Sequence, residues 1–127
     1  MPTLNTPTPT RILVVDDHEP IRTLIQRLLR TEEGFITDEA KNGRVALARV
    51  AETPYDVITL DLMMPELDGF GFLAELERTR PELSSRVVVM TACSNGTLEQ
   101  VPAKYTVLTK PFNAAELLRA VHRCAGH

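Results

Sequence analysis

Continuous apolar runs alternate with amphipathic repeats along most of the chain, beginning at Arg11. The runs are rich in valine, isoleucine and leucine, which is typical of strands that are buried on both faces of a sheet. The repeats place apolar residues three and four positions apart, which predicts helices that cover such a sheet. We therefore predict strands at residues 11–15, 34–40, 55–60, 86–90 and 107–109.

Helices are expected between these strands, and some of them have clear boundary signals. Pro20 stands near the first turn of the first helix, where proline is favoured. A helix at residues 69–80 ends before Pro81, and Asn113 followed by Glu116 forms a capping box that opens the last helix. A second helix is predicted at residues 43–52.

The apolar spacing also predicts which positions of three helices face inward. They are Ile21, Leu24, Ile25, Leu28 and Leu29 in the first helix, Phe72, Leu73 and Leu76 in the third, and Ala114, Leu117, Leu118 and Val121 in the last.

The segment between the fourth and fifth strands is a poor helix former. Gly96 and Pro102 leave room there for about one and a half helical turns. We therefore predict that the fourth helix is short or irregular.

The alternation of strand and helix predicts the fold class. Continuous apolar strands separated by amphipathic helices form a parallel sheet with helices on both faces. Right-handed crossovers restrict this pattern to a doubly wound α/β fold. Ligands of such folds bind beyond the carboxyl ends of the strands, so the chemistry of this chain is expected there.

Composition and charge exclude some function classes. The 127 residues are 43% hydrophobic and 24% charged, which suits one core and a polar surface. The net charge of −3 argues against a strongly cationic face, so no direct nucleic-acid binding is expected. No run of about 18 apolar residues is present, so no membrane span is expected. The first residues do not resemble a secretion signal, and Cys93 and Cys124 are interpreted as reduced thiols of a cytoplasmic protein.

The first ten residues differ in composition from the rest of the chain. They are rich in proline and threonine and have almost nothing to bury. We predict that residues 1–10 form a disordered or extended tail and that residues 11–125 form the domain.

Polar residues stand at the ends of four predicted strands. Asp16 and Asp17 follow the first strand, Asp61 the third, Thr91 the fourth and Lys110 the fifth. If the first strand lies beside the third, three carboxylates meet and repel each other by roughly a few kcal/mol at intermediate dielectric. A lysine and a hard divalent cation would offset this charge, and Mg2+ selects oxygen ligands. Such a site would present a phosphoryl donor to one carboxylate, since carboxylates form acyl phosphates as covalent intermediates.

Four separated motifs resemble those of the receiver domain of two-component response regulators. They occur in the family's order at the predicted strand ends: VVDDHEP at 14–20, LDLMMPELDG at 60–69, VVMTA at 88–92 and LTKPF at 108–112. The resemblance covers about residues 11–125. It implies a flavodoxin-like, five-stranded sheet of strand order 2-1-3-4-5. It also implies Mg2+ as the cofactor and a signalling domain that is not an enzyme acting on other molecules.

The resemblance further implies roles for individual residues. Asp61 matches the aspartate that a histidine kinase or a phosphotransfer protein phosphorylates, so such a protein is the expected partner. Asp16 and Asp17 match the acidic pair that holds Mg2+, with Asp61 itself and the backbone carbonyl of Met63 as further ligands. Thr91 matches the hydroxyl that bonds the phosphoryl oxygen.

The same resemblance extends to the residues around the site. Lys110 matches the lysine that pairs with the phosphoryl group, and the Lys110–Pro111 bond is typically cis in the family. Pro65 and Gly69 match the loop that shapes the site before the third helix.

Three positions depart from the family pattern. Val107 stands where the family usually has an aromatic residue that moves on phosphorylation, and Tyr105 would replace it only near the start of the strand. Met63 and Cys93 occupy the positions that tune the lifetime of the phosphoryl group. Neither side chain orients a hydrolytic water well, so we predict slow self-dephosphorylation.

Two functions remain open at this point. The first is a phosphoacceptor signalling module with an unknown output partner, either a stand-alone regulator or part of a longer protein. The second is a protein-interaction module that works without phosphorylation, which Val107 and the weak fourth helix favour. A metal-dependent phosphatase is disfavoured, because Met63 stands where such enzymes need a second acid. His18 is interpreted as an exposed loop histidine and not as a metal ligand.

Overall fold

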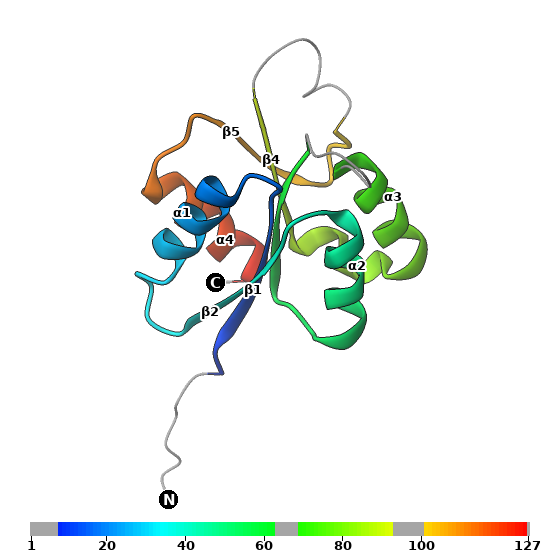
Figure 1. The fold of residues 1–127 in the computed structure, drawn as a ribbon, viewed down its shortest axis with the longest axis horizontal. Coiled ribbons are helices and arrows are strands. Elements are labelled where there is room, and N and C mark those ends of the chain that lie inside the picture. Colours follow the sequence, from blue (N-terminus) through cyan, green and yellow to red (C-terminus); the bar gives the residue numbers. More distant parts are fainter. Residues whose placement is uncertain (1–7, 63–68, 93–100, 127) are drawn as a thin grey trace, which may run out of the picture.

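The computed structural model of the protein, which describes residues 8–62, 69–92 and 101–126, has a five-stranded parallel sheet at its centre (Figure 1). The strand order β2-β1-β3-β4-β5 confirms the predicted order. It makes neighbours of β1 and β3, which are not consecutive in the sequence. The strands are β1 (Thr10–Val15), β2 (Phe35–Ala40), β3 (Val57–Asp61), β4 (Val87–Ala92) and β5 (Thr106–Lys110).

Helices cover both faces of this sheet (Figure 1). On one face lie α1 (Glu19–Leu29) and α4 (Ala114–Ala125), and on the other lie α2 (Gly43–Glu52) and α3 (Gly69–Thr79). Successive residues of a strand point to opposite faces. In β1, Ile12 and Val14 therefore join the core under α1 and α4, while Leu13 and Val15 join the core under α2 and α3. Each fully buried side chain of this kind contributes about 1.5–3 kcal/mol, which explains why the apolar runs specify the sheet.

The helix boundaries follow the signals in the sequence, with one addition. The predicted bounds of α2 are confirmed, and Asn113 forms both capping-box hydrogen bonds with Glu116, at 2.8 and 3.0 Å. α3 ends at Thr79, and Pro81 then begins a short 3-10 helix, η1 (Pro81–Arg86), which was not predicted. Proline loses no hydrogen bond in the first turn of a helix, so the residue that stops α3 also starts η1.

Two residues predicted to face inward are exposed instead. Leu24 is 50% exposed, because the buried side of α1 is centred on Ile25 and Leu29 and Leu24 projects from its flank. Ala114 is also exposed, since it is the first residue of α4 and precedes the turn that reaches the core at Leu117. Ala120, three residues after Leu117, is buried in its place.

The ends of the domain and the weak-helix segment differ in detail from the predictions. Thr10, which we placed in the tail, is the first residue of β1, and its N–H donates to the carbonyl oxygen of Gly34 at 2.8 Å. The predicted tail up to residue 7 lies outside the described residues. Residues 101–105 form turns, and the rest of the predicted fourth helix, residues 93–100, lies outside the described residues. Among the helices that the structure describes, none is long and apolar enough to cross a membrane.

Candidate functional site

Three carboxylates gather at the carboxyl edge of the sheet, as predicted. Asp16 and Asp17 directly follow β1, and Asp61 is the last residue of β3. Each of the three offers one oxygen, and these oxygens lie within 4.8 Å of one another. Asp16 is fully buried and Asp61 is only 6% exposed, whereas Asp17 is exposed.

The pairing of β1 with β3 produces this cluster. Val15 lies opposite Leu60 in the ladder, so the next residues, Asp16 and Asp61, leave the sheet side by side. The N–H of Asp16 still donates to the carbonyl oxygen of Ala40 at 3.1 Å, which extends the pairing of β1 with β2 by one residue. Both buried acids therefore stand on rigid strand ends.

The two carboxylate oxygens of Asp16 differ in their hydrogen bonding. Oδ1 accepts from the backbone N–H of His18 at 2.9 Å, whereas Oδ2 is buried with no hydrogen-bond partner among the described residues. Burial is the main cause that raises the pKa of Asp16. The His18 hydrogen bond and Lys110 oppose the shift, and Asp61 and Asp17 add to it. An isolated buried carboxylate oxygen costs free energy unless a proton or a cation meets it.

The donor set of this cluster fits a hard divalent cation. Carboxylates at this spacing repel each other by about 3 kcal/mol per pair at an effective dielectric constant of about 20. All donor atoms are oxygens, which suits Mg2+ better than a soft metal. His18 is exposed in the loop between β1 and α1.

Lys110 brings a positive charge to the same place from β5. Its Nζ lies 3.6 Å from Asp61 Oδ1, although β4 separates the two strands. The Lys110–Pro111 peptide bond is cis, as the resemblance implied. The ion pair offsets only part of the negative charge of the three acids, so a further cation would still be attracted to the site.

Thr91 lies on β4, between the strands of Asp61 and Lys110. In the ladders, Met90 is opposite Asp61 and Ala92 is opposite Lys110, so Thr91 is one residue from each partner position. Thr91 is buried at the carboxyl edge of the sheet. The structure therefore gathers all five described residues of the predicted site at one edge.

Gly69 lets α3 begin directly against the backbone that carries Asp61. A Cβ atom at this position would lie 2.4 Å from Leu62 Cα and 2.8 Å from the carbonyl oxygen of Asp61. The N–H of Gly69 donates to the carbonyl oxygen of Leu62 at 3.1 Å. Glycine is therefore required here because the backbone of α3 lies against the backbone of Asp61 and Leu62, and not merely because a turn precedes the helix.

Comparison with known proteins gives this arrangement a family. A family model described as "Response regulator receiver domain" matches residues 12–122. The chain belongs to this family. Receiver domains are signalling domains that interact with histidine kinases and with output domains.

Relatives of two kinds resemble this receiver domain. The chemotaxis protein CheY of Listeria monocytogenes is 30% identical over 118 residues, which are 91% of this chain and 98% of that protein. The transcriptional regulatory protein TcrA of Mycobacterium tuberculosis is 41% identical over 121 residues, 89% of this chain but only 46% of TcrA. The chain thus spans less than half of TcrA and nearly all of CheY. Among solved structures, CheY4 of Vibrio cholerae matches with a TM-score of 0.79 and 29% identity, covering 92% of this chain and 99% of that chain.

The structure also shows a residue beside the receiver site that sequence analysis missed. Arg22 donates from Nη1 to the backbone carbonyl oxygen of Asp16 at 2.9 Å and from Nε to Glu39 Oε1 at 2.5 Å. Its signal in the sequence is its spacing, because position 22 lies three and seven residues before the buried Ile25 and Leu29. A charged residue on the buried face of a helix needs a polar partner, and the sequence does not say which.

Met63, Pro65 and Cys93 lie outside the described residues. Val107, at the position of the family's aromatic residue, is 36% exposed, and Tyr105 is buried just before β5 in the core under α2 and α3.

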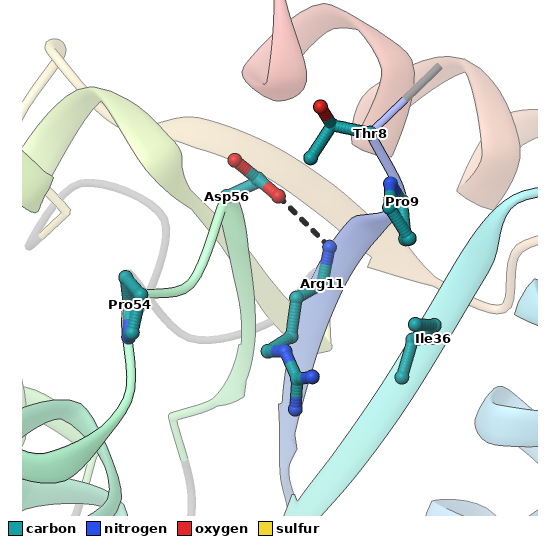
Figure 2. Close-up of a pocket in the computed structure, with 6 residues that line it drawn as sticks. All are labelled: Thr8, Pro9, Arg11, Ile36, Pro54 and Asp56. Atoms are coloured by element: carbon teal, nitrogen blue, oxygen red, sulfur yellow. Dashed lines mark hydrogen bonds between the residues drawn. The ribbon is translucent and has the colours of Figure 1, made fainter. Parts of the chain in front are cut away.

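Figure 2 shows a hollow at the opposite edge of the sheet, lined by Thr8, Pro9, Arg11, Ile36, Pro54 and Asp56. Its volume is about 280 Å³. Its acid is already hydrogen bonded, because the backbone N–H of Arg11 donates to Asp56 Oδ2 at 2.8 Å. This hollow holds no crowded carboxylates, so the carboxyl edge is the better candidate for chemistry.

Proposed function

We propose that this receiver domain accepts a phosphoryl group on Asp61 from a phosphohistidine of a histidine kinase or a phosphotransfer protein. The observation that carries the proposal is the cluster of Asp16, Asp17 and Asp61 oxygens within 4.8 Å, with Lys110 Nζ 3.6 Å from Asp61. Phosphoryl transfer needs mainly positioning and charge neutralisation, and this cluster combines both.

Mg2+ is the cofactor that fits the site. Asp16, Asp17 and Asp61 would hold it, with the backbone carbonyl of Met63 as a further ligand. When bound, Mg2+ would supply positive charge that offsets the carboxylates and the phosphoryl oxygens. The buried Oδ2 of Asp16 would then gain a partner that the described residues do not provide.

The transfer itself requires one bond to form and one to break. An Asp61 carboxylate oxygen attacks phosphorus, and the P–N bond of the phosphohistidine breaks as the new O–P bond forms. The imidazole leaves with the electron pair of that bond and takes up a proton from solvent. Thr91 would donate its hydroxyl hydrogen to a phosphoryl oxygen, and Lys110 would pair with another.

A small-molecule phosphoryl donor tests the proposal without a partner protein. Incubation with acetyl phosphate and Mg2+ is expected to add the mass of one phosphoryl group, and Asp61→Asn is expected to prevent it. Asp56→Asn, at the other edge of the sheet, is the matched control and should still gain the mass (Figure 2). No mass gain in the unmodified protein, or an equal gain in Asp61→Asn, would contradict the proposal.

The described surface offers a place where a protein donor would contact this site. A groove of about 230 Å³ beside Lys110 is lined by Ile21, Leu24, Ile25, Leu28, Pro111 and Phe112. Leu24 is half exposed there and adds apolar surface to the groove. A donor that brings its phosphohistidine to Asp61 must cover this edge, so burial of Leu24 would contribute to its binding.

A phosphorylation-independent interaction module is the second candidate function. The exposed Val107 and the turns at residues 101–105 favour it, because they stand where phosphorylation usually changes the family's surface. Retention of the same partners by phosphorylated protein and by Asp61→Asn, in equal amounts, would support this candidate.

Slow self-dephosphorylation stays a prediction, and a half-life of seconds in purified phosphoprotein would contradict it.

A further inference from the structure

We propose that Arg22 is a positioning residue for the cation site, holding the Asp16 backbone so that the side chain of Asp16 meets the ion. The proposal rests on the proposed function, since it assumes a divalent cation at Asp16, Asp17 and Asp61. It adds a residue outside the set of ligands and assigns it a contact that can be removed.

The hydrogen bonds of Asp16 leave one atom for the ion. Its N–H donates to Ala40, its carbonyl oxygen accepts from Arg22 at 2.9 Å, and its Oδ1 accepts from the N–H of His18 at 2.9 Å. Of these four polar groups, only Oδ2 is buried with no hydrogen-bond partner in the part of the chain that the structure describes. Hydrogen bonds thus fix the N–H, the carbonyl oxygen and Oδ1 of Asp16, and together they orient Oδ2. Of these three bonds, the one from Arg22 comes from a side chain and the other two come from the backbone.

Arg22 is itself held in place. Its side chain is only 12% exposed, and its Nε donates to Glu39 on β2, next to Ala40. The hydrogen bond from Arg22 holds the pKa of Glu39 below its usual value. The planar guanidinium donates in two fixed directions, so it ties the end of β1 to the end of β2 through α1.

Charge alone predicts the opposite effect from positioning. Removing a cation near an acidic site strengthens the binding of Mg2+ if Arg22 acts only through its field. Removing a group that orients a ligand weakens metal binding, typically by about tenfold or more. The sign of the change in Mg2+ affinity therefore separates the two roles.

Titration calorimetry with Mg2+ on the full chain tests this inference. Arg22→Ala is expected to weaken Mg2+ binding by about tenfold. Arg22→Lys keeps the charge but lacks the fork that reaches both acceptors, so we expect a loss of about threefold or more. Arg27→Ala, an exposed position on the same helix, removes the same charge and should leave the affinity unchanged.

The outcomes separate this inference from the function on which it rests. Equal or tighter Mg2+ binding by Arg22→Ala, in a protein that binds Mg2+ normally when unmodified, overturns only the role of Arg22. Absence of Mg2+ binding in the unmodified protein overturns the proposed function and this inference with it. If Arg22→Ala does not fold, as judged by circular dichroism, Arg22→Lys decides by the same criterion, and unchanged affinity in that variant overturns the inference.

Discussion

Acidic side chains form two clusters in the molecule. In one cluster each acid accepts hydrogen bonds, and in the other the acids crowd together. In the Arg11 cluster (Arg11, Asp38, Tyr55 and Asp56), Asp38 accepts from Arg11 Nη1 at 3.2 Å and from the Tyr55 hydroxyl at 2.7 Å, and Asp56 accepts from Arg11 N at 2.8 Å. In the Asp61 cluster (Asp16, Asp17, Asp61 and Lys110), three acids lie beside Lys110, and the residues that the structure describes give Asp16 Oδ2 no hydrogen-bond partner.

The two clusters show how the same residue type serves different ends. An acid that accepts hydrogen bonds from well-placed donors lowers the free energy of the folded chain. Crowded acids raise that free energy, and a protein that keeps them does so where a ligand offsets the cost. The Arg11 cluster is therefore structural, and the Asp61 cluster is where function is expected.

Removing one acid from each cluster gives the largest expected contrast. Asp16→Asn should weaken Mg2+ binding by more than about 100-fold, beyond the range for outer-shell partners, without destabilising the metal-free protein. Asp38→Asn should leave Mg2+ affinity unchanged and lower the free energy of unfolding by about 1 kcal/mol, because two bonds to a charged acceptor become neutral. Calorimetry and urea unfolding measure the two effects, and similar results for both variants would remove the distinction.

A glycine near each edge sharpens the contrast through packing. Gly69→Ala should lower the free energy of unfolding by about 2–3 kcal/mol and slow phosphorylation by acetyl phosphate, because its Cβ would collide with Leu62 and Asp61. Gly34→Ala meets no atom within 4 Å but has a φ of +90°, so it should cost about 1 kcal/mol and leave phosphorylation unchanged. Urea unfolding and phosphorylation rates are the measurements. Equal effects on both would show that the close approach at Gly69 is unimportant.

Exposed apolar residues allow a similar test of partner binding. Leu24→Asp should slow phosphoryl transfer from a histidine kinase by about tenfold, about 1.4 kcal/mol in the barrier, without changing the rate with acetyl phosphate. Ile36→Asp, at the hollow of the Arg11 cluster, should change neither rate (Figure 2). Both side chains are substantially exposed, so neither change should unfold the chain. A slower acetyl phosphate reaction in Leu24→Asp would place the defect in the site and not in partner contact.

The ionisation of Tyr55 in the Arg11 cluster has an effect only at alkaline pH, so it is the smallest effect near neutral pH. Burial, with the hydrogen bond to Asp38, raises the pKa of Tyr55 to about 12, and burial raises the pKa of Tyr105 to about 12 as well. In both tyrosines the folded state favours the neutral phenol. The stability that each phenol contributes is complete below about pH 10 and is lost as the pH rises toward 12. Tyr55→Phe should remove about half of this alkaline loss of unfolding free energy, measured by urea unfolding at a series of pH values. An unchanged slope would show that the phenol of Tyr55 titrates normally.

Much of the fold was predictable because each strand carries its own signal. The run at residues 11–15 is apolar at every position after Arg11, and the residues of β3 are all buried, so local pattern and burial agree. The capping box at Asn113 is equally local. The predictions for Leu24 and Ala114 were wrong, because spacing identifies an apolar stripe but not which flank of it meets the sheet.

The sequence by itself determined the strands, most of the helices and the residues at the strand ends, because hydrophobic period and capping act over a few neighbouring positions. The tertiary structure alone decided that Arg22 reaches the backbone of Asp16, that Gly69 rests on the chain at Asp61, and that Lys110 spans β4 to within 3.6 Å of Asp61. Each of these contacts joins groups from different elements, and their distances depend on strand register and helix placement, which no local pattern specifies.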